Sequence, residues 1–459
     1  MRILYFSPLP PVASGIADYS AELLPYLSRH FDITLCVAEN STVSPVLSEC
    51  CEIMNAPFKP TDADAFDAVV YHMGNDNRFH GYIYDALQLV PGIVVAHETV
   101  YYHSLHFRTV GQGDLDGFRR LLTQTYGELR AERAFDQLDD WDRNPQAFPL
   151  FAPTLANAVG VIVHSKYARE QVQRCRPDLP VAVIPHHLSL PSIETDLGTA
   201  DALPSGSQSH VNHQRLELRR QLGLDAKFVV GSFGYVTKSK RPAVMLRAFA
   251  RFHRDNPDAL CCIVGDVAPE IDMPALIAEL ELPQSAVIVT GRVTLEDFIR
   301  YMQAMDVAVN LRLPTNGEAS GALIRLLGLG VPTVVSDVDA FAELPDDCCV
   351  KVPTDALEED TLYAVLTAFS EDETLPAAIG MNARRHIGDH HTLEGSAHAY
   401  FRFIEQIVSG TAEPVGPLED FAVSEVLSGL GATLAGWGVT ERHDTLLRPI
   451  AQALADLGM

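Results

Sequence analysis

The sequence predicts an α/β protein with two doubly wound parallel sheets, one in each half of the chain. The first observation is that short apolar runs of strand length alternate with segments that have helical apolar spacing. The second is that this alternation lapses near the middle, at residues 191–213, into a stretch rich in Pro, Ser, Gly and polar residues, and then resumes. Because strands separated by helices pair in parallel through right-handed crossovers, each half is expected to form a sheet with helices on both faces.

The bulk composition agrees with two ordinary domains. The chain has 459 residues, of which 47% are hydrophobic and 20% charged, as in a soluble globular protein. A formal net charge of −26 argues against nucleic acid as a partner and against docking on anionic lipid. The apolar runs are too short for a membrane span, and the N-terminal residues lack the pattern of a signal peptide. We therefore expect no transmembrane segment and a cytoplasmic location.

The cysteines indicate reduced thiols. The chain has 8 cysteines, which include three adjacent pairs and show no CxxC spacing. Several lie in apolar runs, where a thiol behaves as a small hydrophobic group. A zinc site is therefore not expected.

Residues 1–190 are expected to form the first Rossmann-like domain. The predicted strands are Arg2–Phe6, Asp32–Val37, Asp67–Tyr71, Gly92–Ala96, Val159–Val163 and Val181–Ile184, with a helix at Ile16–Ser28. A mostly helical insertion at about residues 104–153, which holds Trp141, interrupts the alternation. Such insertions often lie over the active face of a sheet, although a plain surface excursion fits the pattern nearly as well.

Residues 214–395 are expected to repeat this architecture, and residues 396–459 to be helical. The predicted strands are Phe228–Ser232, Leu260–Val264, Ala286–Val289, Val307–Leu311, Thr333–Ser336 and one at Cys349, with helices from Pro242 and through Leu295–Met305. A further apolar stripe runs through Phe421–Leu457.

The stretch Leu313–Pro332, LPTNGEASGALIRLLGLGVP, has the pattern of a phosphate-binding loop. An apolar strand precedes it, and a helix too apolar for the surface follows its glycines. Gly317, Ser320 and Gly321 allow the backbone to approach a ligand, and the free amides at the helix start point toward it. The pattern predicts a nucleotide diphosphate site, although many similar α/β turns bind nothing.

A basic loop lies at the same edge of the predicted second sheet. Lys238, Lys240 and Arg241 stand directly before the helix that begins at Pro242. A solvated turn is the alternative interpretation of this cluster. Both loops follow parallel strands, so their coincidence favours nucleotide binding.

Taken together, several motifs resemble the family 4 retaining glycosyltransferases of the GT-B fold, in a bacterial branch with a GEASG-type donor loop. They are SPLPPVASGIADYSAELLPYL, VVAHETV, GYVTKSKRP, VGD, TGRV, DVAVNLR, GEASGALIRLLGLGVPTVVSD and AFAELP, and they cover about residues 1–405. The resemblance implies sugar transfer from a nucleotide diphosphate donor of the UDP or GDP type, with retention of anomeric configuration. The implied acceptor is a glycan, a lipid-linked molecule or a small molecule.

The resemblance also implies how the reaction is housed. No metal or other cofactor takes part, and HETVY at His97 is not a zincin motif, because Tyr101 stands where the second histidine would be. The donor lies in the second domain, the acceptor lies in the first, and a cleft separates them. The chain crosses back to the first domain near Tyr400–Gly410.

Three residues take catalytic roles by this resemblance. His97 ends the strand Gly92–Ala96, faces the cleft and contacts the donor sugar, although a satisfied core histidine is the alternative. Lys240 lies against the donor diphosphate and stabilises the charge that builds on the leaving phosphate. Glu318 hydrogen-bonds the hydroxyls of the donor sugar, unless it is only a solvated loop carboxylate.

The remaining expected site residues fall into two groups. The donor-binding group is Gly15, Gly234, Tyr235, Lys238, Arg241, Gly265, Gly317, Ala319, Ser320, Gly321, Ala322 and Arg325, and the acceptor-side group is Asp18, Glu98, His103 and Trp141. Lys238 or Arg241 is expected to supply a second positive charge beside the diphosphate. Gly15 and Asp18 could instead make a turn and cap a helix.

Arg325 departs from the family pattern. It stands where many members carry the glutamate that binds the ribose. It therefore either belongs to the donor site or pairs with Glu343 or another carboxylate of its own domain.

Two other functions stay open. A GT-B sugar-nucleotide 2-epimerase shares the fold, but it needs an acid/base carboxylate set that the sequence does not let us assign. A non-catalytic sugar-nucleotide-binding partner of a glycosyltransferase complex is compatible with Tyr235 and Arg325 at unusual positions.

Overall fold

The structure, a computed structural model, describes most of the chain. It covers residues 1–190 and 207–418 except 13, 40, 41, 57, 137, 139, 142, 225 and 227. Beyond residue 418 it describes only residues 430, 434, 439, 440, 443, 447–450 and 452. The predicted apolar stripe Phe421–Leu457 therefore lies almost entirely outside the described residues.

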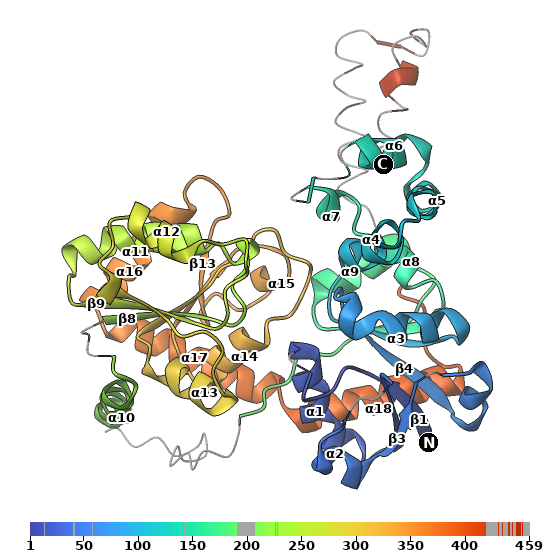
Figure 1. Cartoon of the computed structure of the whole chain (residues 1–459), viewed down its shortest axis with the longest axis horizontal. Helices are drawn as coiled ribbons and strands as arrows, with labels where there is room; N and C mark the ends of the chain where they lie inside the picture. Colours follow the sequence, from blue (N-terminus) through green and yellow to red (C-terminus); the bar gives the residue numbers. More distant parts are fainter. Residues whose placement is uncertain are drawn as a thin grey trace.

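The first half of the chain forms a parallel sheet with seven described strands in the order β3-β2-β1-β4-β5-β6-β7 (Figure 1). The strands are β1 Arg2–Phe6, β2 Asp32–Val37, β3 Glu52–Asn55, β4 Ala68–Met73, β5 Gly92–Ala96, β6 Ala158–Val163 and β7 Val181–Val183. The predicted strands are confirmed to within about two residues, but β3 was not predicted. β3 is an edge strand with mostly exposed side chains, so it lacks the apolar run that marks the others.

Helices cover both faces of this sheet. They are α1 Gly15–Leu27, α2 Pro45–Cys50, α3 Asn77–Leu89, α4 Tyr102–Arg108, α5 Leu115–Tyr126, α6 Glu128–Asp136, α7 Asn144–Ala147, α8 Phe151–Thr154 and α9 Lys166–Cys175, with 3₁₀ turns η1 Pro60–Ala65 and η2 Val110–Gln112. The predicted insertion is helical, since α4 to α8 follow one another between β5 and β6.

The second half forms a parallel sheet with six described strands in the order β10-β9-β8-β11-β12-β13. The strands are β8 Phe228–Phe233, β9 Ala259–Val264, β10 Val287–Val289, β11 Val307–Asn310, β12 Thr333–Ser336 and β13 Val350–Val352. The helices are α10 Ser207–Leu222, α11 Pro242–Asp255, α12 Met273–Glu279, α13 Leu295–Ala304, α14 Gly321–Gly328, α15 Asp339–Ala342, α16 Glu358–Glu371 and α17 Thr374–His390, with 3₁₀ turns η3 Lys238–Lys240 and η4 Gln284–Ala286. The predicted fold class, two Rossmann-like domains, is confirmed.

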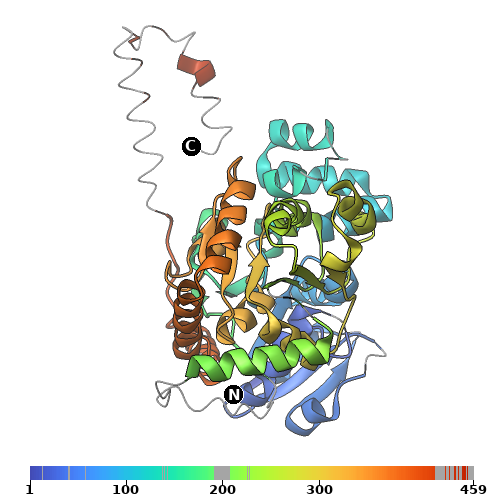
Figure 2. The same ribbon diagram turned by 90° about the vertical axis from the view of Figure 1, so that its left-hand side faces the viewer.

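The segment between the sheets differs from the prediction. Residues 191–206 of the predicted linker lie outside the described residues, and from Ser207 the chain is already helical in α10. Figure 2 shows α10 in bright green on the outer side of the second domain, where it packs against α13. Arg215 and Arg219 of α10 both form ion pairs with Asp306, the residue before β11. These ion pairs fix the helix to the start of that strand.

The last described long helix, α18 Leu393–Ser409, belongs to the first domain. It packs against α1 and buries Tyr400, Phe403 and Ile404 in one apolar cluster with strands of the first sheet. The chain crosses back between α17 and α18, at His391 and Thr392, and not near Tyr400–Gly410 as expected. α18 begins directly after the crossing, where Thr392 caps it, its hydroxyl accepting from the amide of Gly395 at 3.1 Å.

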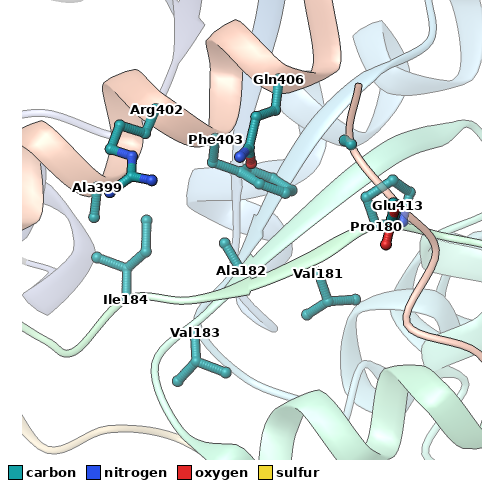
Figure 3. Close-up of a pocket in the computed structure, with 11 residues that line it drawn as sticks. Pro180, Val181, Ala182, Val183, Ile184, Ala399, Arg402, Phe403, Gln406 and Glu413 are labelled. Atoms are coloured by element: carbon teal, nitrogen blue, oxygen red, sulfur yellow. The ribbon is translucent and has the colours of Figure 1, made fainter. Parts of the chain in front are cut away.

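A cavity of about 290 Å³ lies between β7 and α18 (Figure 3). Ile184 and Ala182 face Ala399 and Phe403 across it. None of its lining residues belongs to the cluster of charged side chains at the second sheet, so this cavity of the first domain is not the candidate site. Among the described residues, no helix is both long and apolar enough to cross a membrane.

Candidate functional site

The order of strands in the second sheet reverses between β8 and β11, which places a switch point there. The loops that follow these strands, residues 234–241 and 311–320, therefore lie at the position where doubly wound sheets bind ligands. A backbone hydrogen bond from the amide of Leu313 to the carbonyl of Ser239, at 2.8 Å, joins the loops. The two loops predicted from the sequence to approach phosphate are thus side by side.

Lys240 lies beneath the first of these loops. Its Nζ donates to the carbonyl of Phe233 at 2.6 Å. Gly234 has φ +85°, and a Cβ at that position would lie 2.9 Å from this Nζ, so glycine leaves room for the ammonium group. Burial and the nearby Arg312 cation lower the pKa of Lys240, while Glu318 opposes them. An anion bound here would favour the charged form of the lysine.

Arg312 is the residue of this site that the sequence reasoning missed. It stands two positions after the end of β11 and is only 8% exposed. Its Nε donates to Oε1 of Glu318 at 3.0 Å, and its Nη1 donates to the carbonyl of Leu311 at 2.9 Å. Burial lowers the pKa of Arg312, while Glu318 raises it. The signal that could have found it is an arginine placed directly after an apolar strand in the same edge of the sheet as Lys240.

Glu318 is held by its own loop. Besides Arg312, it accepts from the amide of Asn316 at 2.7 Å through Oε2. Both carboxylate oxygens therefore have protein partners, although each oxygen can accept a further hydrogen bond. Its contact with a donor sugar remains a prediction.

The N-terminus of α14 completes this edge of the sheet. Ser320 caps the helix, its hydroxyl accepting from the amide of Leu323 at 3.3 Å and donating to Oδ1 of Asn310 at 3.4 Å. Nδ2 of Asn310 is buried and has no hydrogen-bond partner among the described residues. Buried amide donors are costly to leave unpaired, so this orphaned group marks a place where a ligand acceptor fits. Ala319, Gly321 and Ala322 are half-buried around it.

Other predicted donor-binding residues lie elsewhere or act differently. Arg241 has φ +57° and turns to the buried Glu358, with Nε at 3.1 Å from Oε2, so its charge is already paired. Lys238 is exposed, and the side chain of Tyr235 is 54% exposed. Close packing explains why position 265 is a glycine, because a Cβ there would lie 2.4 Å from the carbonyl oxygen of Gly234. Arg312, and neither Lys238 nor Arg241, is therefore the second cation beside Lys240.

Arg325 pairs across the domains and not within its own. Its Nη2 donates to Oε1 of Glu22 in α1, while its Nε is buried without a partner among the described residues. Glu343, the partner suggested from the sequence, instead accepts from the amides of Lys166 at 2.9 Å and Tyr167 at 2.6 Å. A carboxylate of the second domain thus lies at the N-terminus of α9 in the first domain, where the helix dipole favours it. Figure 1 shows α14 and α15 facing α1 and α9.

Gly317 approaches the first domain. It has φ +74°, and a Cβ there would lie 2.3 Å from the hydroxyl oxygen of Thr99. The amide and hydroxyl of Thr99 donate to the carbonyl of Asn316 at 2.6 Å and 3.0 Å. The glycine predicted to admit a ligand therefore admits the loop after β5.

His97 lies in a buried chain of histidines. Its Nε2 is 2.9 Å from Nδ1 of His72, and its Nδ1 is 3.2 Å from Nε2 of His164. Burial, together with the neighbouring histidines, lowers the pKa of His97 well below its usual value. His97 is 8% exposed, so the alternative of a satisfied core histidine describes it better than a side chain that faces a cleft.

Glu98, the next residue, is the first-domain group that meets the donor loop. Its Oε1 accepts from the amide of Asn75 at 3.3 Å, and its Oε2 accepts from Nδ2 of Asn316 at 3.2 Å. Burial, and then the carboxylate of Glu318, raise the pKa of Glu98 to about 7. Perturbed carboxylates of this kind cluster at functional sites.

The other predicted acceptor-side residues border the same region. His103 contacts Asn75, its Nδ1 lying 3.0 Å from Nδ2, and its ring stacks on Trp141. Gly15, which belongs to the predicted donor-binding group, opens α1 with no atom within 4 Å of the place where its Cβ would be. Burial and Glu22 raise the pKa of Asp18, while Arg325 and Arg292 of the second domain oppose them, so Asp18 lies on the side of α1 that faces that domain. Among the described residues, no group of three or more His, Cys, Asp or Glu side chains is arranged to hold a metal ion.

Most of the second domain is similar to a known protein family. Residues 227–369 match the family described as Glycosyl transferases group 1, and both loops of the switch point lie within this match. This part of the chain is therefore similar to that family. No curated protein sequence matches the chain.

Solved structures resemble the whole fold. HepE of Anabaena, in complex with UDP, is 13% identical, with a TM-score of 0.59 over 88% of this chain and 100% of its own. Sucrose-phosphate synthase from Thermosynechococcus elongatus is 15% identical, with a TM-score of 0.60 over 89% of this chain and 100% of its own. A glycosyltransferase from Rickettsia africae is 12% identical, with a TM-score of 0.60 over 89% of this chain and 98% of its own. The structural similarity over nearly the whole length of these proteins shows that this chain shares the GT-B fold.

Proposed function

We propose that the chain is a retaining, metal-independent glycosyltransferase that moves a sugar from a nucleotide diphosphate sugar to a glycan, lipid-linked or small-molecule acceptor. The observation that carries the proposal is the pair Lys240 and Arg312 at the switch point of a glycosyltransferase domain. Two cations beside a helix N-terminus suit a diphosphate, which carries its negative charge in a compact group.

The same groups suit the departure of the nucleotide. As the bond between the anomeric carbon and the phosphate oxygen breaks, negative charge builds on that phosphate. Lys240, Arg312 and the amides that begin α14 are preorganised to stabilise it, which is the work that a metal ion does in other transferases.

Retention is proposed to follow from attack on the same face of the sugar. The acceptor oxygen bonds to the anomeric carbon, and the proton of the acceptor hydroxyl passes to the leaving phosphate oxygen. The engagement of Glu318 by Arg312 and by the amide of Asn316 supports this route, because it holds the loop carboxylate as a binding group and not as a nucleophile.

A UDP-type donor is proposed first, because the similar HepE structures contain UDP and UDP-glucose. A cytoplasmic location is part of the proposal. All eight cysteines are unpaired, as expected in a reducing compartment.

Ligand-induced thermal stabilisation is the first test. Among UDP, GDP, ADP, CMP and dTDP, one nucleotide is expected to raise the melting temperature most, since a ligand at about a hundred times its Kd adds roughly 2.7 kcal/mol. The sugar nucleotide of that base then serves as substrate, and donor consumption and products are followed by chromatography. A nucleotide that binds without turnover on any acceptor would support a non-catalytic partner, and a 2-epimer product would support the epimerase.

Lys240→Ala tests the assignment of the leaving-group site. Turnover should fall about a hundredfold or more, the usual effect of losing one preorganised charge contact. Arg254→Ala removes an exposed cation at the end of α11 and is the matched control. Near-normal turnover by a folded Lys240→Ala protein would place the diphosphate elsewhere.

A further inference from the structure

An exposed tryptophan of the insertion is held between two histidine rings of the first domain. Trp141 is 45% exposed, and the ring of His103 stacks on it with centroids 5.6 Å apart and an interplanar angle of 18°. The ring of His106 meets Trp141 edge-on at 4.6 Å. An indole fixed by two neighbouring rings offers a rigid apolar surface at little cost in conformational entropy.

A row of polar groups leads from this surface to Glu98. Nδ1 of His103 lies 3.0 Å from Nδ2 of Asn75, and the amide of Asn75 donates to Glu98. Oδ1 of Asn75 also accepts from the amide of Ser104 at 3.0 Å, which fixes the orientation of the side-chain amide. Because Nδ2 must donate to His103, the Nδ1 of His103 accepts, and in the neutral ring Nε2 carries the proton.

The insertion that carries Trp141 also contacts the donor loop. Gln146, which follows Trp141 in the insertion, donates to the carbonyl of Thr315 at 2.9 Å. At the other end of the polar row, Glu98 accepts from Asn316. The insertion and the carboxylate of Glu98 therefore both contact residues 315–316 of the donor loop.

We propose that the acceptor is a carbohydrate whose ring covers Trp141 and one of whose hydroxyls is bound by Glu98. The inference rests on the proposed function and names the substrate class of the first-domain site. A pyranose ring has an apolar face of C–H groups that stacks on an aromatic ring, while its hydroxyls donate to carboxylates. Trp141 and Glu98 supply these two kinds of contact in one place.

The surrounding charges favour a neutral acceptor over an anionic one. Burial, and then the carboxylates of Glu318 and Asp76, raise the pKa of Glu98, so negative groups face it from the donor loop and from the loop after β4. A phosphate or carboxylate at this position would meet like charge. A neutral sugar end is therefore preferred to a lipid phosphate at the reacting position.

Fluorescence tests the subsite without any turnover. Trp437, the other tryptophan of the chain, lies outside the described residues, so Trp437→Phe leaves Trp141 as the only indole. Titration with methyl glycosides of glucose, galactose, mannose and N-acetylglucosamine should change its emission in a saturable way for at least one of them. Emission that stays constant throughout every titration would overturn the inference.

Kinetics tests the two residues separately. With the accepted glycoside, Trp141→Ala should raise the acceptor KM about threefold to tenfold, as expected for losing one aromatic contact. Glu98→Gln, which keeps a carbonyl for the amide of Asn75, should lower kcat/KM for the acceptor about tenfold or more. Donor hydrolysis without acceptor should persist in Trp141→Ala, so loss of that hydrolysis in this variant would point to the donor site and not to the subsite.

Leu129→Ala is the matched control, since Leu129 is an exposed apolar side chain of the same insertion. Transfer to a polyprenyl phosphate in detergent micelles is the competing assay. Two results together would contradict a carbohydrate acceptor. The first is transfer to this lipid but to no glycoside, and the second is that Trp141→Ala leaves the transfer to the lipid unchanged.

Discussion

Arg312 determines the charge of the candidate donor site. Its guanidinium is almost fully buried, close to the ammonium of Lys240, and Glu318 is the carboxylate that faces both. Burying two cations with one carboxylate is unfavourable by itself, because charged groups lose hydration. A bound diphosphate would supply the missing negative charge, so the arrangement is best explained by its ligand.

Arg312→Gln should therefore lower kcat/KM for the donor about a hundredfold, as expected for one preorganised charge contact in a site that excludes water. Initial-rate kinetics with varied donor concentration measures the effect. Arg247→Gln is the control, since Arg247 pairs with Glu359 on the surface of the same domain. Equal effects of the two substitutions would show that Arg312 has no special role.

At the scale of elements, the carboxyl ends of β4, β5 and β6 bring three histidines into one hydrogen-bonded chain. Nδ1 of His164 lies 2.8 Å from the carbonyl oxygen of Ile184. Because a carbonyl can only accept a hydrogen bond, this Nδ1 carries the proton. His164 then accepts from His97 through Nε2, and His97 accepts from His72. The tautomers of all three rings are thereby fixed, and neither nitrogen of His97 is left for a substrate.

This histidine chain, together with the neighbouring His80, should make the stability of the protein sensitive to acid. Burial lowers the pKa of His80 and of His164 to about 4, whereas an unfolded histidine titrates near 6.5. Between these values the unfolded chain binds protons that the native protein does not. The free energy of unfolding should then fall as pH drops from about 6.5 to about 4, by about 1.4 kcal/mol per pH unit for each proton.

Glu98 acts in the opposite direction. Its native pKa of about 7 lies above its usual value of 4.5, so it contributes stability as pH falls from about 7 to about 4.5. One carboxyl offsets only one of the histidines, and the net change should still be a loss. Urea denaturation at a series of pH values measures it.

The histidine His80 provides a specific variant for this measurement. His80→Gln removes one group with a lowered pKa and should reduce the slope of stability against pH by about one proton. His398→Gln, at an exposed position of α18, should leave the slope unchanged. A stability that is flat between pH 4.5 and 6.5 in the wild type would contradict the burial of neutral histidines.

The sequence was sufficient for the parts of the fold that local pattern determines. The central strands are apolar runs, and the loop after β11 has glycines where positive φ and close approach require them. The ion-pair partners of the arginines could not be predicted from the sequence, because they depend on tertiary contacts. Arg241 pairs with a carboxylate 117 positions away, and Arg325 with one 303 positions away in the other domain.

His97 illustrates the same limit for a motif. A histidine after a strand can face a ligand or the core, and the choice depends on His72 and His164, which stand on neighbouring strands. The apolar pattern gave no sign that these three positions meet. Trp141 and Glu98 were named from the sequence, but their connection through Asn75 and His103 required the folded chain.

For the whole molecule, the important feature is that the donor loop touches the first domain through its backbone. Thr99 binds the carbonyl of Asn316, Glu98 binds the side chain of Asn316, and Gly317 leaves room for Thr99. Donor loop and acceptor region thereby share one set of contacts. We therefore expect domain closure and assembly of the site to be coupled, as in enzymes that exclude water by hinge motion.

Gly317→Ala should separate the domains. The added Cβ would meet Thr99 in a residue whose φ is +74°, so the contact must open. We expect a larger radius of gyration in small-angle scattering and at least a tenfold loss of transfer activity, the order of magnitude expected for a small misplacement of reacting groups.

Gly223→Ala separates this effect from simple backbone strain. Gly223 has φ +70° but no atom within 4 Å of its Cβ position, so the substitution costs similar strain without a collision. If the two variants gave the same scattering curve, the contact at Thr99 would not be what holds the domains together.

The packing of α18 means that the first domain is not one continuous stretch of polypeptide. Tyr400, Phe403 and Ile404 are buried among its side chains, and the hydroxyls of Tyr19 and Tyr400 lie 2.9 Å apart, yet α18 comes after the whole second domain. A fragment that stops at residue 190 lacks this helix and exposes an apolar face. By contrast, two fragments divided between residues 190 and 207 carry complementary surfaces. Such halves should reassemble when produced together, so the natural units for dissecting this protein are not its domains but its two interlocking fragments.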